Sequence, residues 1–212
     1  MEVSTLLSLM GNLSLGNDNI TQVERAIFLQ YLNLANLELY QITANFNQDL
    51  LVQVTLANQV DSNQVQLPET PYLVNSVYDL THQRQLRRIS LNDAITKDPA
   101  FIANGNPTQY FVKRDVLEFV PTQTTITSIK IWYVPQPIIL AENTPEQDIP
   151  YPLAYHPVLV DGALYYLFQE EGGFKNLQKA QAAQARWEIG QTRLLAYLYN
   201  SSGQLFSTFS SV

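Results

Sequence analysis

The chain has 212 residues, no cysteine and a formal net charge of −7, with 46% hydrophobic and only 15% charged residues. This hydrophobic content excludes a disordered protein, and the lack of cysteine excludes disulfide scaffolds and thiolate metal sites. We expect one domain with an appendage rather than two domains, and neither a membrane span nor a signal peptide is visible.

The N-terminal quarter predicts two helices. Residues 2–10 predict a short helix that Gly11 ends. Thr21 and Glu24 then have the spacing of a capping box, which predicts the start of a long helix that reaches about Ala44. Its apolar stripe is formed by residues at helical spacing: Ile20, Val23, Ile27, Tyr31, Leu34 and Leu37.

The middle of the chain predicts a β-rich segment. Alternating and β-branched residues predict strands at residues 50–57, 64–67, 72–80, 83–89, 109–113, 116–120 and 124–134. The strands 72–80 and 83–89 are expected to pair around Thr81–His82. Ser90 is expected to cap a short helix that Pro99 closes.

A proline-rich connector follows, because six of the eleven prolines lie between residues 131 and 171. Proline fixes φ and favours extended backbone before it, so we expect this connector to be stiff. Pro157 fits the first position of a helix, with His156 as its N-cap. From Val158 to Phe168 the only charge is Asp161, which predicts a helix buried in a core or at a subunit interface.

The C-terminal part predicts a second long helix at about residues 175–199, after the pair Gly172–Gly173. One face of this helix carries Leu177, Ala180, Ala183, Trp187, Gly190, Leu194 and Leu198. We assign Trp187 to a subunit interface. The order of helices, strands and helices predicts an α+β fold. Its expected parts are a helical bundle of residues 1–49 and 150–199, a β-rich insertion of residues 50–149, and an extended tail of residues 200–212.

Catalytic chemistry finds little support in the sequence. His82 and His156 lack ligand spacing, and turn or cap roles are expected for them. No motif for a nucleophile, phosphate loop or metal is present. Glu170–Glu171 is interpreted as a solvated helix end, although a carboxylate pair for glycoside hydrolysis stays open at this point. We expect no catalytic residue, metal or cofactor.

Charge is distributed in blocks along the chain. Residues 131–171 hold six acidic and no basic residues, whereas residues 84–130 hold seven basic and four acidic ones. The basic block contains the cluster Arg84, Arg87, Arg88, Lys113 and Arg114. Such a cluster would track phosphates in a nucleic-acid reader. We favour an inter-subunit contact with the acidic blocks, because the chain is acidic overall and no nucleic-acid motif accompanies the cluster.

Three groups of residues together resemble a known family. The first is YLNLAN at residues 31–36. The second comprises Leu67–Pro68, Tyr72, SVYDL at 76–80, LRRIS at 86–90 and PTQY at 107–110. The third is IWYVPQP at 131–137 with IPYPLAYHPVLVDGAL at 149–164, before the alanine-rich helix. These patterns resemble the head–tail adaptor, or connector, proteins of tailed bacteriophages over roughly residues 20–199.

The resemblance implies a structural virion protein at the head–tail junction, made in the host cytoplasm. It implies a ring, usually of twelve copies, that lies beneath the portal protein, continues the DNA channel and docks tail or neck proteins. DNA would pass without sequence-specific binding. We expect the uncharged tail to dock on the portal through Leu205, Phe206 and Phe209. The alternatives are another tail or baseplate structural protein, or a tail-borne cell-wall hydrolase.

Overall fold

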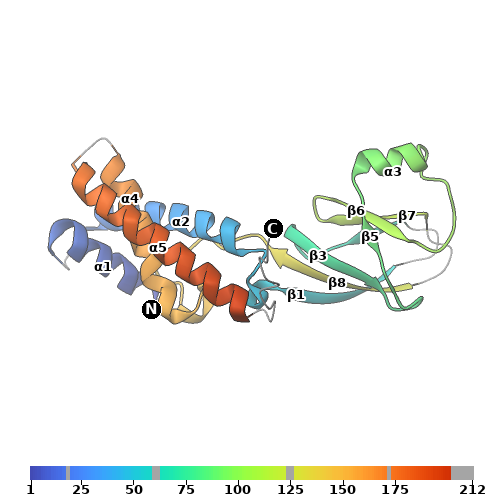
Figure 1. The fold of residues 1–212 in the computed structure, drawn as a ribbon, viewed down its shortest axis with the longest axis horizontal. Helices are drawn as coiled ribbons and strands as arrows, with labels where there is room; N and C mark the ends of the chain where they lie inside the picture. The colour runs from blue at the N-terminus through green and yellow to red at the C-terminus, as the bar shows by residue number, and fades with distance from the viewer. Residues whose placement is uncertain (18–19, 59–62, 123–126, 171–172, 202–212) are drawn as a thin grey trace, which may run out of the picture. The chain divides into compact units, whose positions relative to one another are not determined.

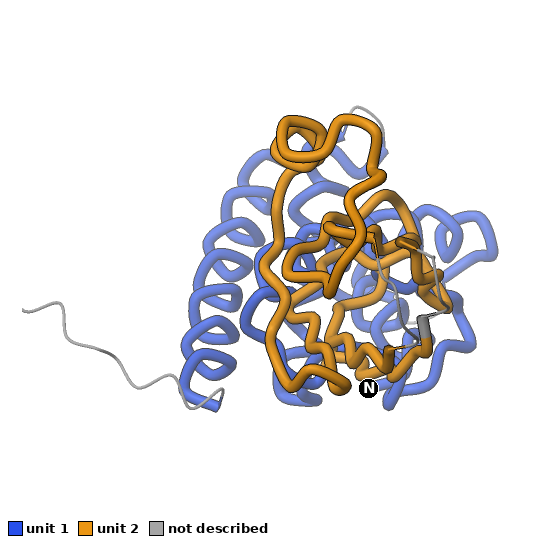
Figure 2. The backbone as a smooth tube through the Cα atoms, turned by 90° about the vertical axis from the view of Figure 1, so that its right-hand side faces the viewer, with its two compact units in different colours: residues 1–49, 137–212 blue, residues 50–136 orange. Residues whose placement is uncertain are grey.

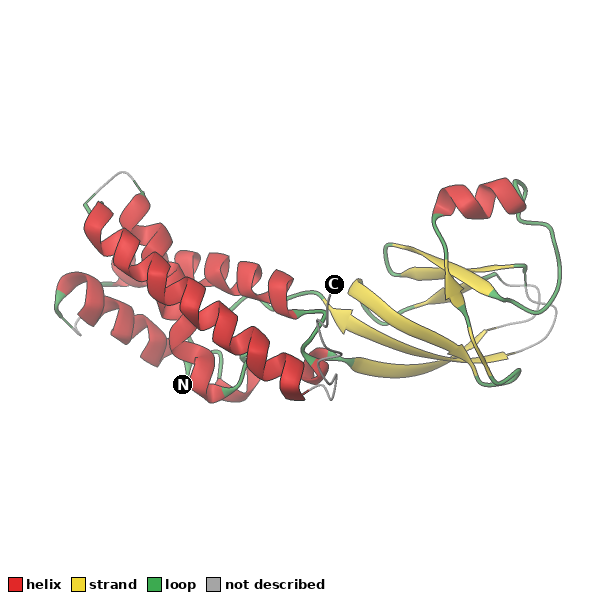
Figure 3. Cartoon of the chain, in the orientation of Figure 1, coloured by secondary structure: helices red, strands yellow, loops and turns green. Residues whose placement is uncertain are grey.

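A computed structural model describes residues 1–17, 20–58, 63–122, 127–170 and 173–201. The chain divides into two compact units, which are coloured separately in Figure 2. The helical unit comprises Met1–Asp49 and Pro137–Val212, and the β unit comprises Leu50–Gln136. Figure 3 shows that strands and helices are segregated in this way, except for one short helix within the β unit. The predicted α+β class is confirmed.

The helical unit contains four α-helices and short 3₁₀ turns among its described residues (Figure 1). The helices are α1 (Val3–Leu15), α2 (Gln22–Thr43), α4 (His156–Gln169) and α5 (Leu177–Ser201), and the turns are η1 (Gln48–Leu50, at the boundary with the β unit), η2 (Glu146–Asp148) and η3 (Leu153–Tyr155). The capping box predicted at the start of α2 is confirmed. The Thr21 hydroxyl accepts from the Glu24 N–H at 3.3 Å, and the Glu24 carboxylate accepts from the Thr21 N–H at 2.6 Å.

The first helix is longer than the sequence predicted, and Gly11 does not end it. Gly11 lies inside α1, where an added Cβ would meet Cγ2 of Ile20 at 2.4 Å. Its role is therefore close contact rather than termination. Gly16 ends the helix instead, with φ of 69°, in the left-handed region that suits glycine.

The predicted apolar stripe of α2 is rotated relative to the face that the structure buries. The buried apolar residues of this helix are Phe28, Tyr31, Leu32, Ala35, Leu39 and Tyr40. Val23 is 70% exposed, and Leu34 and Leu37 are also exposed. The physical reason is that α2 carries apolar residues on two faces, of which only one covers α4.

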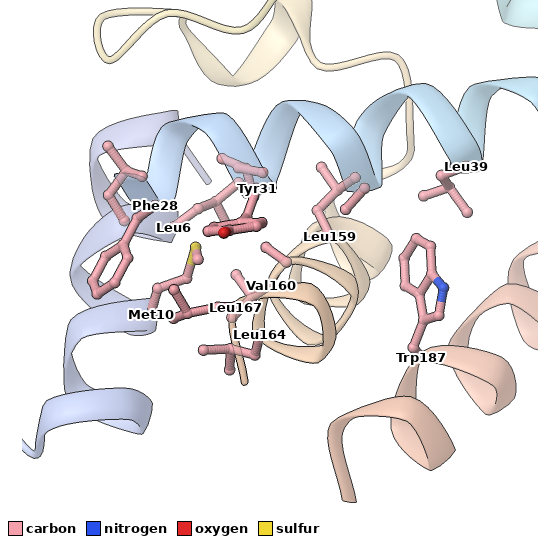
Figure 4. Close-up of a cluster of buried hydrophobic side chains, with 14 of the residues drawn as sticks. Leu6, Met10, Phe28, Tyr31, Leu39, Leu159, Val160, Leu164, Leu167 and Trp187 are labelled. Atoms are coloured by element: carbon pink, nitrogen blue, oxygen red, sulfur yellow. The ribbon is translucent and has the colours of Figure 1, made fainter. Parts of the chain in front are cut away.

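The core of the helical unit is centred on α4, which contacts α1, α2 and α5. Figure 4 shows its apolar side chains directed at residues of α1 and α2, including Met10, Phe28 and Tyr31. The buried side chains of α4 itself include Leu159, Val160, Ala163, Leu164, Leu167 and Phe168. The burial predicted for this helix on several sides is explained by this position between the other helices.

His156 is not the N-cap of α4, because it is the first residue of the helix and Tyr155 precedes it as the cap. Its ring is buried, with Nε2 2.8 Å from the Tyr151 carbonyl oxygen and Nδ1 3.2 Å from the Met1 carbonyl oxygen. The imidazole therefore joins the two chain segments beside the start of α4 instead of capping the helix.

The described strands of the β unit form two four-stranded sheets. One sheet has the order β1 (Val52–Asn58), β8 (Thr127–Pro135), β3 (Pro71–Asp79) and β4 (Arg84–Gln85). The other has the order β2 (Gln64–Gln66), β7 (Val116–Val120), β6 (Gln109–Lys113) and β5 (Arg87–Arg88). Apolar residues of both sheets share one core, among them Val77, Ile131, Leu117 and Phe119.

The strand predicted at 83–89 is divided between the two sheets. Residues 84–85 pair with β3 around the predicted turn, whereas residues 87–88 pair in parallel with β6. Leu86, between them, is buried in the shared core. The short helix predicted after Ser90 is α3 (Leu91–Lys97), and its buried Ala94 faces Phe111 and Val120 of the second sheet.

Candidate assembly surfaces

An apolar groove of about 410 Å³ lies along α2 in the helical unit. Its apolar wall includes Tyr31, Leu34 and Leu37 from α2 and Ile138 and Ile139 from the connector. Leu34, Leu37 and Ile138 are exposed, and Ile139 is 86% exposed. Exposed aliphatic side chains that gather in one concave place are typical of a binding surface.

Two asparagines of the YLNLAN stretch hold the connector against α2 and so form the groove. The Asn33 amide donates to the Leu140 carbonyl at 3.0 Å and accepts from the Leu140 N–H at 2.7 Å. The Asn36 amide donates to the Ile138 carbonyl at 3.1 Å. The backbone groups in the middle of α2 already bond one another within the helix. The asparagine side chains therefore supply the hydrogen-bond partners that the backbone of the extended connector needs.

An acidic segment follows the groove in the connector. Glu142 contacts Arg25 at the start of α2 at 2.5 Å, and Glu146 accepts from the Met1 ammonium at 2.6 Å. The bond from that ammonium holds the pKa of Glu146 below its ordinary value. Asp148 is exposed, and Glu2 and Glu142 line a second hollow of about 480 Å³. Glu142 and Glu146 are thus paired with cations of the same chain, and the exposed Asp148 and Glu2 add negative charge to this end of the helical unit.

The predicted basic cluster is spread over three places in the β unit. Arg87 and Arg88 are exposed on β5 and lie opposite Gln109 and Tyr110. Lys113 and Arg114 are exposed at the turn between β6 and β7. Lys113 is three residues beyond Tyr110, or about 10 Å along the strand. The two pairs therefore occupy opposite ends of β6.

Arg84 lies apart from those pairs, on β4 of the other sheet. Its guanidinium is partly buried, and Nε and Nη2 have no hydrogen-bond partner within the described part of the chain. The sequence could not reveal this separation, because residues 84–88 look like one continuous basic strand.

A short apolar ridge on α3 was missed by the sequence analysis. Leu91 and Ile95 are exposed and four residues apart, so they lie on one face of the helix. The Ser90 hydroxyl and N–H hold the pKa of Asp93 below its ordinary value, and Lys97 and Arg87 lower it further. The basic residues Arg87 and Arg88 directly precede this ridge. The spacing of Leu91 and Ile95, four residues apart, is the sequence signal that could have revealed this ridge.

Trp187 lies in the core of the helical unit and is 3% exposed (Figure 4). Trp187 therefore packs inside the subunit, and its role at a subunit interface stays a prediction. Leu205, Phe206 and Phe209 lie outside the described residues. Their predicted docking role stays a prediction.

The two histidines occupy structural positions. His82 Nδ1 lies 2.7 Å from the buried Asp79 carboxylate, which also accepts from the N–H groups of Thr81 and His82 at 3.0 Å each. His82 thus belongs to the turn between β3 and β4. No group of three or more His, Asp or Glu residues that could hold a metal occurs in the described ranges.

Glu170 and Tyr166 lie at and near the C-terminal end of α4. Glu170 is exposed directly after α4, and Glu171 lies outside the described residues. Tyr166 donates a hydrogen bond to Glu38 of α2, so this aromatic residue connects two helices.

No helix in the part of the chain that the structure describes has the length and apolar character needed to cross a membrane.

A comparison with protein families identifies a model that covers nearly the whole chain. Residues 1–207 match the family model described as SU10 adaptor protein. The match includes the helical unit, the β unit and all three groups of residues singled out in the sequence. No curated protein matches the chain.

Proposed function

The chain belongs to the SU10 adaptor protein family, and from this premise we propose that it forms a ring beneath the portal of a tailed bacteriophage. The family match over residues 1–207 carries this proposal and confirms the resemblance to head–tail adaptors. The chain is accordingly a structural adaptor protein of a bacteriophage. Its proposed tasks within the virion are to continue the DNA channel and to present the surface on which the tail docks.

The distribution of charge supports a ring. Contacts around a ring are heterologous, so each copy must present two different faces that fit one another. The helical unit has the acidic segment with Glu142, Glu146 and Asp148, and the β unit has the exposed Arg87 and Arg88. Opposite charges on two different surfaces of one chain let each copy attract the complementary surface of its neighbour, as a head-to-tail contact requires.

The net charge of −7 supports a channel that does not hold DNA. Carboxylates repel the phosphates of a passing duplex, so an acidic lining lets DNA slide without binding a particular sequence. We propose this role for the ring as a whole. Twelve copies is the number that the family resemblance implies.

The tail of residues 200–212 is the proposed contact with the portal. It carries Leu205, Phe206 and Phe209 and no charge. Fully burying two phenylalanines and a leucine would contribute roughly 5–8 kcal/mol before the cost of ordering the segment. Short segments with a few apolar anchors commonly bind by placing those anchors in pockets of a partner.

The mass of the purified, assembled protein tests the ring. Native mass spectrometry of a twelve-membered ring would give twelve times the subunit mass of 24.1 kDa, and negative-stain images would show a closed annulus. A protein that stays monomeric at all concentrations, with no particle-bound ring, would contradict the proposal.

A further inference from the structure

We propose that the apolar groove beside α2 binds the α3 ridge of a second copy of this chain. This inference rests on the ring of the proposed function, and it assigns the two surfaces that meet. The ridge consists of Leu91 and Ile95, with Arg87 and Arg88 beside it. The groove is the one lined by Leu34, Leu37 and Ile139.

The groove has the chemistry of a helix-binding site. Leu34 and Leu37 stand one turn apart on α2, and Ile138 and Ile139 form the facing wall. The asparagine bonds to the connector fix that wall, so the groove exists before any partner arrives. A short amphipathic helix binds such a groove through residues three or four positions apart.

The ridge on α3 has the complementary form. Ala94 is buried against the second sheet, which leaves Leu91 and Ile95 on the outer face. The Ser90–Asp93 capping box holds the start of the helix, with the Asp93 N–H donating to the Ser90 hydroxyl at 3.1 Å. A fixed helix that exposes two aliphatic residues loses little entropy when it is buried.

Charge selects this occupant over an unrelated apolar partner. Arg87 and Arg88 lie four and three positions before Leu91, and the exposed Glu142 and Asp148 follow the groove wall in the connector, where Glu142 also pairs with Arg25. Docking the ridge would therefore bring an exposed arginine pair toward the acidic segment of the next copy. Complementary rims of this kind set the orientation of a contact whose apolar centre holds it together.

The groove and the ridge are two different surfaces, on the helical unit and on the β unit, so each copy can accept one neighbour and dock on another. Such a head-to-tail contact is heterologous, and a contact of this kind builds a ring when its rotation closes.

Disulfide trapping tests this contact cleanly, because the natural chain has no cysteine. Leu37→Cys and Ile95→Cys are prepared as separate full-length proteins, mixed, allowed to assemble and mildly oxidised. A disulfide between these two proteins can form only between copies. The control pairs Ile95→Cys with Val23→Cys, because Val23 is 70% exposed on the same helix and does not line the groove.

We expect a disulfide-linked dimer from the first mixture at least tenfold above that from the control mixture. If a ring forms but both mixtures cross-link equally or not at all, the groove has another occupant and the proposed ring survives. If the wild-type chain forms no oligomer, the ring and this contact fail together.

A second measurement tests the proposal independently, in case the cysteine substitutions themselves perturb the contact. Leu37→Glu should reduce the ring fraction in native mass spectrometry at least tenfold, whereas Val23→Glu should leave it unchanged. Adding Ile95→Lys to the Leu37→Glu chain should restore assembly in part. Normal rings from Leu37→Glu, with lost attachment to phage particles, would assign the groove to a different virion protein and overturn the proposal.

Discussion

Gly162 lies directly against the ring of Trp187, since a Cβ on this glycine would meet the ring atoms Cε3 and Cζ3 at 2.8 Å. Gly190 has the same relation to Val158, whose two γ-methyl groups would lie 2.8 Å from an added Cβ. The missing side chains thus set how closely α4 and α5 approach. This close approach explains why α4, which is strongly apolar, packs against a helix that is rich in alanine.

Replacing Gly162 with alanine should destabilise the helical unit despite the better helix propensity of alanine. Overpacking costs about 1–3 kcal/mol, which exceeds the propensity gain of about 1 kcal/mol. Urea denaturation monitored by circular dichroism measures the loss. Gly173→Ala is the control, because nothing lies within 4 Å of a Cβ there. Equal stability of both variants would show that α4 and α5 can separate freely.

Asn33→Ala should release the connector from α2. The substitution leaves the N–H and carbonyl of Leu140 without the partner that Asn33 provides, at a cost of about 1–3 kcal/mol. We expect faster proteolysis between residues 137 and 145, together with a lower urea midpoint. Asn33→Asp keeps the acceptor and loses the donor, so its effect should be intermediate. An unchanged cleavage rate in both variants would argue that the groove wall is held by other contacts.

Arg87→Glu combined with Arg88→Glu should weaken assembly rather than DNA binding. Both side chains are exposed on β5, so reversing them should act mainly on the rate and orientation of association between copies. Sedimentation velocity measures the ring fraction, and a gel-shift assay measures DNA affinity. Lys113→Glu with Arg114→Glu, at the other end of β6, tests whether the second pair of the predicted cluster takes part in the same contact. Normal assembly with lost DNA binding would favour the nucleic-acid interpretation.

Truncation after Asn200 should leave the subunit folded and reduce its attachment to the head. The buried residues of α5, which extend to Leu198, remain in the truncated chain, whereas all three apolar anchors are removed. Thermal unfolding checks the fold, and the occupancy of purified particles checks attachment. Wild-type occupancy of the truncated protein on particles would disprove portal docking by the tail.

Acid should destabilise the protein through its capping carboxylates. The pKa of Glu24 is lowered by its bonds from the Thr21 N–H and hydroxyl, and the pKa of Asp93 is lowered by its bonds from Ser90. A lowered folded-state pKa gives stability that is present above the unfolded-state pKa and is lost as the pH falls through the folded-state value. The loss should begin below about pH 4.5. Glu24→Gln should make unfolding less steeply pH-dependent, and an unchanged acid profile would contradict this role.

Local signals in the sequence predicted much of the fold. The capping box at Thr21 and the cap at Ser90 need only neighbouring residues to form, and both are confirmed. The predicted strands 109–113 and 116–120 are likewise found as β6 and β7. The buried side of α2 could not be predicted, because Leu34 and Leu37 are as apolar as Leu32 and Leu39. Only the position of α4 decides which set is covered.

The candidate surfaces were harder to predict than the elements that carry them. The prediction placed residues 137–149 with the β-rich middle, but Asn33 and Asn36 bind residues 138 and 140 to the helical unit. A side-chain bond across more than 100 positions leaves no trace in spacing or periodicity. His156 was interpreted as a cap for the same reason, since its partners at Met1 and Tyr151 are set by tertiary structure.

Because the β unit is inserted within the helical unit, synthesis of the chain completes the β unit before the helical unit. Residues Leu50–Gln136 complete the β unit while α2 still lacks α4, its main partner. At ordinary rates of synthesis, the ribosome needs on the order of 10 s to add the residues that separate the two helices. Phe28, Leu32 and Leu39 lack their α4 neighbours throughout this interval. The groove beside α2 forms only when residues 138–140 of the connector have been made, so an assembly contact through this groove requires a chain that already contains the whole β unit.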